Sequence, residues 1–241
     1  MGNQHHRTVD RVAELLEAAA AHPEGVTLSG LARAVDAPVS SVQKLVDGLV
    51  AVGYLDEVAR RYRLGPAPSV LSIRAGRPAV PVRHAVLEEL AVRLGLPVQL
   101  AVRVGDDAVW VDWAGADEAF DYALASQVRR PLVESAAGRV LFAHLPEAVR
   151  RAVVGQARPD DAAGAVALLD AAEVIRTTGR ETGASGRLLP EATAVAVPVW
   201  QDGRAGPEVV AALSAVDRTG SALDRADEVA SVLREAVGGL A

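Results

Sequence analysis

Apolar residues recur with the period of an α-helix in three stretches of the first 53 residues. The first stripe follows Thr8, which is suited to cap a helix, and it ends at His22-Pro23-Glu24-Gly25. The second follows Thr27 and stops at Val35, and the third starts at Pro38 and stops before Gly53. The pattern therefore predicts three short helices, the third with Val42, Leu45, Val46 and Leu49 buried.

Residues 54–57 and 60–64 read as two short strands around a tight turn that ends at Gly65-Pro66. Three short helices followed by a two-stranded hairpin is the layout of a winged helix-turn-helix, in which the third helix enters the major groove of DNA. We therefore assign residues 1–66 to a DNA-binding domain. Residues 67–80, with a helix over 69–74 and then Gly76 and Pro78, are predicted to be a linker helix and connector.

Residues 81–241 carry both helical and strand periodicity and form the predicted second domain. Apolar and other residues alternate over 98–104, which predicts a half-buried strand. Further strands are expected at 109–113, 121–124, 193–200 and 209–216, with a turn at 202–204, and helices at 134–145, 146–154, 161–178 and 224–237. This order predicts an α+β fold built on an antiparallel sheet.

Composition restricts the chemistry. The 241 residues include no cysteine, which excludes disulfides, thiolate metal sites and cysteine nucleophiles and agrees with a reducing compartment. There is no secretory signal and no apolar run of membrane-spanning length, so we expect a cytoplasmic protein with no membrane partner and no metal or cofactor. Because the net charge is −6, any contact with DNA must come from a local group of cations.

Candidate DNA contacts lie on the third helix and on the hairpin. The proposed readers of base edges are Ser40, Ser41, Gln43 and Lys44, since Gln pairs with adenine and Lys with guanine while Ser suits phosphates equally well. The proposed contacts to backbone or minor groove are Arg7, Arg60, Arg61 and Arg63. The competing interpretation is a solvated charged surface, but the complete order of helix, turn, helix and wing favours DNA binding.

Candidate ligand contacts in the second domain begin with Ser135, Ala136, Ala137 and Gly138, a small-residue helix start whose backbone N–H groups suit an oxygen of a ligand. An ordinary N-cap with close packing is the alternative. The rare aromatic residues Trp110, Trp113 and Phe120 either line a pocket or pack in the core. The hydroxyl groups of Ser185 and Ser214 are further candidates, although such groups often satisfy only backbone.

An enzyme is the competing class of function. It would use His84 or His144 as a base and Ser135 as a nucleophile. No G-x-S-x-G sequence, metal-spaced histidine pair or phosphate-binding loop surrounds these residues. We therefore expect no enzymatic activity.

Three stretches resemble the IclR family of bacterial regulators along almost the whole chain. They are residues 31–66, closing with Tyr62-Arg63-Leu64-Gly65; residues 130–147, with Pro131-Leu132 before a small-residue Gly-Arg helix start; and the strand pair at 191–200 and 209–217. The resemblance implies that residues 81–241 form a GAF-like effector-binding domain. It also implies a homodimer or a dimer of dimers, double-stranded operator DNA as partner, and control by a small-molecule effector.

The polar positions that acid-binding relatives offer on the late strands are Ala194 and Val216 here, with Ser214 as the retained hydroxyl. The resemblance thus favours a weakly polar effector and a repressor whose operator binding it modulates. The alternative is a ligand-independent regulator whose second domain only oligomerises.

Overall fold

The computed structural model describes residues 6–75, 82–115, 129–185, 192–201 and 208–238. The predicted strand at 121–124, the turn at 202–204, Phe120 and most of the connector lie outside these residues. The chain folds as two compact units, residues 1–79 and 80–241.

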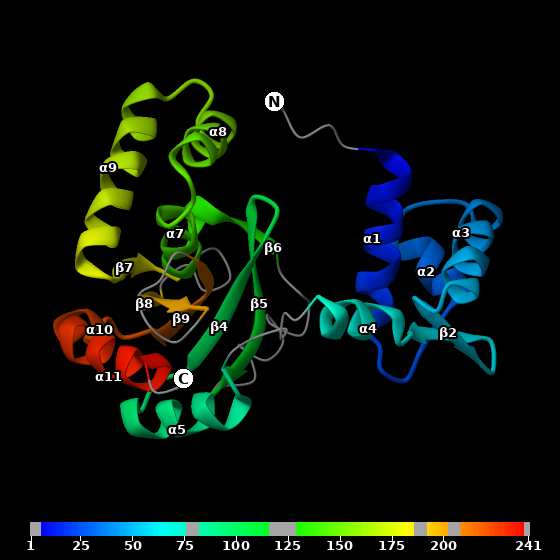
Figure 1. Ribbon diagram of the computed structural model, residues 1–241, viewed down its shortest axis with the longest axis horizontal. Coiled ribbons are helices and arrows are strands. Elements are labelled where there is room, and N and C mark those ends of the chain that lie inside the picture. The colour runs from blue at the N-terminus through cyan, green and yellow to red at the C-terminus, as the bar shows by residue number, and fades with distance from the viewer. Residues whose placement is uncertain (1–5, 76–81, 116–128, 186–191, 202–207, 239–241) are drawn as a thin grey trace. The chain divides into compact units, whose positions relative to one another are not determined.

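The first unit consists of helices around a small sheet (Figure 1). Its elements are α1 (Arg7–Ala20), β1 (Val26–Thr27), α2 (Leu28–Ala34), α3 (Val39–Ala51), β2 (Leu55–Val58), β3 (Arg61–Leu64) and α4 (Ala67–Arg74). The predicted three helices and hairpin are confirmed, and Leu15, Leu31, Val42 and Val46 are buried in the centre of the unit. The strand β1 was not predicted, and it pairs with β3 to give the order β1-β3-β2.

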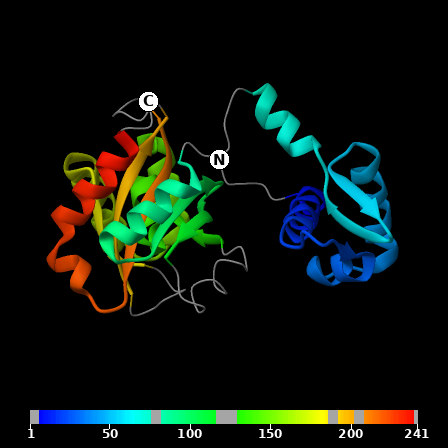
Figure 2. The same ribbon diagram turned by 90° about the horizontal axis from the view of Figure 1, so that it is seen from below.

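The helix ends differ in part from the prediction. Helix α1 begins at Arg7 with His6 as an N-cap that makes no side-chain hydrogen bond, so Thr8 lies inside the helix and does not cap it. Thr27 caps α2, because its Oγ1 accepts a hydrogen bond from the backbone N–H of Gly30 at 3.2 Å. Helix α4 follows β3 closely along the chain (Figure 2). None of its residues is buried.

The turn of the wing contains two residues with left-handed backbone angles. Ala59 has φ 50° and Arg60 has φ 61°, the combination of a two-residue hairpin turn, and Val58 pairs with Arg61 around it. Arg60 therefore belongs to the turn, whereas the sequence had predicted it as part of the second strand. Neither residue type favours this conformation.

Ala59→Gly is expected to stabilise the first unit by about 1 kcal/mol, because glycine adopts a positive φ without steric cost. Urea denaturation of the full chain measures the effect. In Ala34→Gly, at the end of α2, the same change is expected to destabilise by about 0.5–1 kcal/mol. Equal effects of the two substitutions would contradict the assignment of strain to the turn.

The second unit is a six-stranded antiparallel sheet with helices on both faces, which confirms the α+β prediction (Figures 1 and 2). The strands are β4 (Val98–Val104), β5 (Asp107–Ala114), β6 (Arg129–Pro131), β7 (Glu181–Ala184), β8 (Thr193–Trp200) and β9 (Val209–Asp217), in the order β6-β5-β4-β9-β8-β7. The helices are α5 (His84–Leu94), the 3-10 turn η1 (Leu132–Glu134), α7 (Ala136–Ala143), α8 (Glu147–Ala157), α9 (Ala162–Thr178), α10 (Ser221–Asp224) and α11 (Ala226–Gly238).

Two apolar clusters lie on opposite faces of this sheet. Helices α5 and α11 pack on one face, against Leu100, Val197 and Leu213. Helix α7, backed by α8 and α9, packs on the other, against small residues such as Ala101 and Ala196. We call this second surface the α7 face; it comprises the residues of the six strands that point toward α7.

The prediction of a half-buried strand at 98–104 is wrong for the first half of β4. Gln99 is 4% exposed and Ala101 is fully buried. The reason is that helix α7 covers the face on which they lie, whereas Val102 is partly exposed and Arg103 and Val104 at the end of the strand are exposed. Alternation of residue types indicated one buried face, and the tertiary structure buries both.

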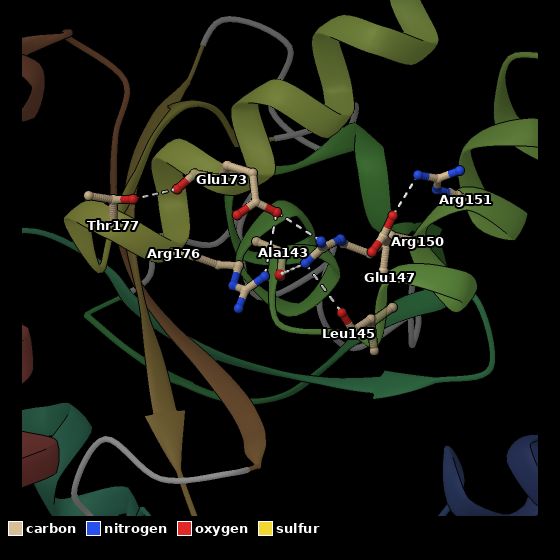
Figure 3. Close-up of polar contacts among 8 residues, drawn as sticks. All are labelled: Ala143, Leu145, Glu147, Arg150, Arg151, Glu173, Arg176 and Thr177. Atoms are coloured by element: carbon tan, nitrogen blue, oxygen red, sulfur yellow. Dashed lines mark hydrogen bonds and ion pairs between the residues drawn. The ribbon is translucent and has the colours of Figure 1, made fainter.

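A buried arginine connects the helices behind the α7 face (Figure 3). The Nη1 atom of Arg150, on α8, donates to the carbonyl oxygen of Ala143 at the end of α7, at 2.8 Å. Its Nη2 atom donates to Oε1 of Glu173 on α9, also at 2.8 Å. The side chain of Arg150 is only 7% exposed, so this one residue ties α7, α8 and α9 together.

Candidate functional site

The third helix presents a polar surface opposite its buried stripe. Ser40, Ser41 and Lys44 are exposed on α3, while Val42 and Val46 are buried beneath them. Gln43 is partly buried, and its Nε2 donates to Oδ1 of Asp47 at 2.6 Å. Three of the four predicted readers are thus exposed without a side-chain bond to another described residue, whereas Gln43 is bonded to Asp47 on the same helix.

The candidate arginines of the first unit are exposed, but they differ in whether their side chains bond to other residues. The guanidinium of Arg61 donates to the carbonyl oxygen of Gly25 at 2.7 Å, which fastens the wing to the turn before α2. Arg60 and Arg63 make no ion pair or side-chain hydrogen bond with a described residue, and Arg7 begins α1. Arg61 therefore has a structural contact that the sequence did not reveal.

At the start of α7, polar groups form hydrogen bonds with one another. Oγ of Ser135 accepts a hydrogen bond from the N–H of Gly138 at 3.0 Å, and the carbonyl of Ser135 accepts one from Arg139. Ala136 and Ala137 are buried. Any Cβ at Gly138 would overlap the carbonyl oxygen of Leu132, so glycine is required for close packing. The N–H of Gly138 is thus engaged in the helix cap, and only the N–H groups before it remain for a ligand.

Strand register brings several candidates into one row on the α7 face. Gln99 of β4 pairs with Trp113 of β5 on one side and with Ser214 of β9 on the other, and Ser214 pairs in turn with Ala196. Directly paired residues of antiparallel strands point to the same face. Gln99 was missed by sequence reasoning, because a glutamine in an alternating strand was taken to point to solvent.

The two tryptophans reach the same face through an irregularity in β5. Residues three apart on a regular strand point to opposite faces, but Ala101 pairs with Trp110 and Gln99 with Trp113, with a register shift between Leu100 and Ala101. Trp110 is buried within the apolar cluster, and Trp113 packs against it. Both tryptophans therefore lie on the α7 face, where Trp110 packs in the apolar core.

The remaining candidates of the late strands are buried. Ala194 and Val216 pair across β8 and β9 and belong to the same apolar cluster as Trp110. Ser185 follows β7 and is 7% exposed, and its backbone N–H donates to Ala192. These residues surround the row of Gln99 and Ser214 without forming a polar site of their own.

The histidines and Ser135 do not form a catalytic group. Nδ1 of His84, at the start of α5, lies 2.8 Å from Oδ1 of Asp112, and the hydrogen bond to this carboxylate raises the pKa of His84. Burial lowers the pKa of His144, whose ring meets Trp200 edge-on with centroids 5.1 Å apart. His84 begins α5 and His144 follows the end of α7, while the Ser135 hydroxyl caps the start of α7. No helix among the described residues is long and apolar enough to span a membrane.

A winged helix-turn-helix joined to a separate α+β unit is typical of DNA-binding transcription regulators. Residues 8–59 match the IclR helix-turn-helix domain, and residues 78–240 match the C-terminal domain of the bacterial transcriptional regulator IclR. The chain therefore belongs to the IclR family, as its sequence motifs had indicated.

Individual relatives are distant but cover most of the chain. The HTH-type transcriptional regulator TtgV of Pseudomonas putida is 28% identical over 178 residues, which are 72% of this chain and 69% of TtgV. The probable transcriptional regulator SauR of Cupriavidus necator is 28% identical over 211 residues, or 84% and 83% of the two chains. A solved IclR homolog from Microbacterium hydrocarbonoxydans, complexed with 4-hydroxybenzoate, is 28% identical with a TM-score of 0.69 and 96% coverage of each chain.

Proposed function

We propose that this regulator is a homodimer, or a dimer of dimers, that represses transcription from a pseudo-palindromic operator and responds to a small organic effector. The observation that carries the DNA-binding part is the exposed polar surface of α3, where Ser40, Ser41 and Lys44 lie opposite a stripe of buried Val42, Val46 and Leu49 and partly buried Leu45. A recognition helix needs this division between a buried face and a reading face. Action on an operator would place the protein in the cytoplasm.

The wing supplies contacts of a second kind. Arg60 and Arg63 are exposed cations, suited to phosphates or to the minor groove, and Arg7 offers another at the start of α1. Because Arg61 is bonded to the backbone of Gly25, we assign it mainly to holding the wing in place. The net charge of −6 makes these local cations, and not the protein as a whole, the source of attraction to DNA.

The effector would lie on the α7 face of the second unit. Trp110, Trp113 and Ser214 share that face with Ala194 and Val216, next to the Ser135–Gly138 helix start and Ser185, and Phe120 is a further candidate. A relative of the same family holds 4-hydroxybenzoate, which supports a small organic ligand. Effector binding would change the relative placement of the two DNA-binding domains of a dimer through residues 67–80, with a coupling of about 1–3 kcal/mol.

A second candidate is a ligand-independent regulator. The burial of Ala194 and Val216 in a packed cluster favours it, because side chains in van der Waals contact leave no space for a ligand at those two positions. Its second unit would serve only to bring two helix-turn-helix units together. A measurable effector excludes this candidate.

A gel shift with the full chain on the intergenic DNA beside its own gene tests the proposal, in moderate salt with competitor DNA. We expect specific retention that depends on both half-sites of a palindrome. Failure to retain that DNA, followed by failure to select any sequence from genomic fragments, would exclude the regulator function.

Lys44→Ala is expected to weaken operator binding by about tenfold and to relax sequence preference at one base position, because Lys44 is the cation on the exposed surface of α3. Arg93→Ala is the control; it removes one exposed positive charge from α5 of the second unit and should leave operator affinity unchanged. Unchanged affinity and preference in Lys44→Ala would remove Lys44 from the reading residues.

A further inference from the structure

The exposed surface of α3 carries a carboxylate, although this surface is the one that approaches DNA in the proposed function. Asp47 is the only acidic residue of the helix, and it is exposed. It lies three residues after Lys44 and seven after Ser40, so the helical period places all three on one face. DNA phosphates repel a carboxylate, which makes Asp47 unsuited to contact the DNA backbone. Its role on this surface is therefore different from that of the neighbouring cation.

The side chain of Asp47 contacts one residue of the same helix, Gln43. Nε2 of Gln43 donates to Oδ1 of Asp47 at 2.6 Å, a short distance for an N–H···O bond, as charged acceptors produce. Within the part of the chain that the structure describes, Asp47 has no other side-chain hydrogen bond and no ion pair. The two residues thus form an isolated pair on the surface of α3.

This hydrogen bond fixes the orientation of the Gln43 amide. The terminal torsion of a glutamine has two broad orientations that exchange the positions of its oxygen and its nitrogen. A carboxylate can only accept hydrogen bonds, so only the nitrogen of the amide can face Asp47. The oxygen Oε1 and the second N–H of Nε2 have no partner among the described residues, and both remain available to a base.

The available acceptor and donor of Gln43 match one base. In the major groove, adenine presents a donor at N6 and an acceptor at N7, which are complementary to Oε1 and to the second N–H. Guanine presents two acceptors, O6 and N7, and a glutamine would need both of its N–H groups to bind them. One of these groups is already bound to Asp47. The pair therefore favours adenine and disfavours guanine.

Asp47 lies behind the residues that are placed to read bases. The N-terminal residues of a recognition helix contact the base edges. Helix α3 starts at Val39, and Asp47 follows Gln43 by four residues, which correspond to about 6 Å along the helix axis. Asp47 is thus one turn farther from the start of the helix, where it can hold Gln43 without contacting the same base.

We propose that Asp47 is a positioning residue for base recognition, which holds the amide of Gln43 in the orientation that pairs with adenine. The proposal deepens the proposed function and rests on the placement of α3 in the major groove. A Gln–Asp pair at this spacing also stabilises a helix slightly. That stabilisation alone would leave the choice of base unchanged, so base preference distinguishes the two roles.

Selection from a random-sequence duplex library with the full chain identifies the preferred DNA site. Fluorescence anisotropy with this site and its single-base variants then measures the preference at each position. We expect Gln43→Ala to lower the preference for adenine over guanine at one position by about 30-fold. Asp47→Ala is expected to lower it at the same position by about tenfold, whereas unrelated DNA binds as well or slightly better because a negative charge is lost.

Two further variants control for charge and for the loss of the acceptor. In Asp47→Asn the side-chain oxygen can still accept from Gln43, so we expect the preference to stay within about threefold of the wild type. Glu14→Ala removes an exposed carboxylate from α1 and should keep the wild-type preference. Thermal melting checks that each variant is folded.

The double variant Gln43→Ala/Asp47→Ala separates positioning from direct reading. If Asp47 acts through Gln43, the double variant has the same base preference as Gln43→Ala alone. A further change of preference in the double variant would overturn the proposal, because Asp47 would then read a base itself. A response of a base other than adenine to Gln43→Ala would also overturn it.

The same measurements separate this proposal from the proposed function. If the full chain selects no sequence from the library, operator binding fails and the role of Asp47 fails with it. If the full chain selects a site and folded Asp47→Ala keeps the wild-type preference for adenine, operator binding stands and Asp47 is not a positioning residue.

Discussion

Gly138→Ala is expected to lower the free energy of unfolding of the second unit by about 3 kcal/mol. The added methyl group would overlap the carbonyl oxygen of Leu132, which is part of the backbone and cannot turn aside. Leu132 is itself held by a hydrogen bond from its N–H to the carbonyl of Asp106 at 3.1 Å. Either η1 or the start of α7 must therefore shift, and chemical denaturation of the full chain measures the cost.

The control for this substitution is Gly155→Ala on α8. No atom lies within 4 Å of a Cβ built at Gly155, and alanine favours a helix more than glycine does. This variant is expected to be more stable than the wild type by about 0.5–1 kcal/mol. If Gly138→Ala were also neutral or stabilising, the tight packing of α7 on η1 would be refuted.

Arg150→Met is expected to destabilise the second unit by about 2–3 kcal/mol. Methionine keeps most of the apolar stem, but it leaves the carbonyl oxygen of Ala143 without the donor that lies 2.8 Å away (Figure 3). Glu173 contributes less to this loss, because its side chain is 59% exposed and water can replace the guanidinium. Urea denaturation followed by circular dichroism measures the difference.

The adjacent residue provides a matched control. Arg151 also lies on α8 and also pairs with a glutamate, Glu147, at 2.6 Å, but both side chains are well exposed. Arg151→Met is expected to change stability by less than about 0.5 kcal/mol, as is usual for exposed ion pairs. Similar losses in the two variants would show that burial of Arg150 is not what makes its contacts important.

The sequence predicted the long elements of the fold correctly because their apolar residues recur with the period of a helix or a strand. That spacing is required to bury one face of the element. The helices α2, α3 and α9 and the strands β8 and β9 begin and end within about two residues of their predicted bounds. The short strands β1, β6 and β7 were missed, because two to four residues are too few to show a periodic pattern of apolar positions. They exist because longer neighbouring strands offer them hydrogen-bonding partners.

The candidate ligand site was less predictable for a different reason. The sequence identified Trp110, Trp113 and Ser214, but no sequence rule shows that a register shift places both tryptophans on one face. Gln99 was not among the predicted ligand contacts, because polar residues in strands usually point to solvent. Only the covering of the α7 face by helix α7 buries Gln99.

The two outermost strands of the large sheet are its shortest. Among the described residues, β6 offers three residues and β7 four at the margins of a sheet whose inner strands have seven to nine. A margin this short exposes few free N–H and C=O groups, so a second chain can add only a brief strand to it. Pairing of a second chain along these described margins is thereby disfavoured, which opposes open-ended aggregation by strand addition.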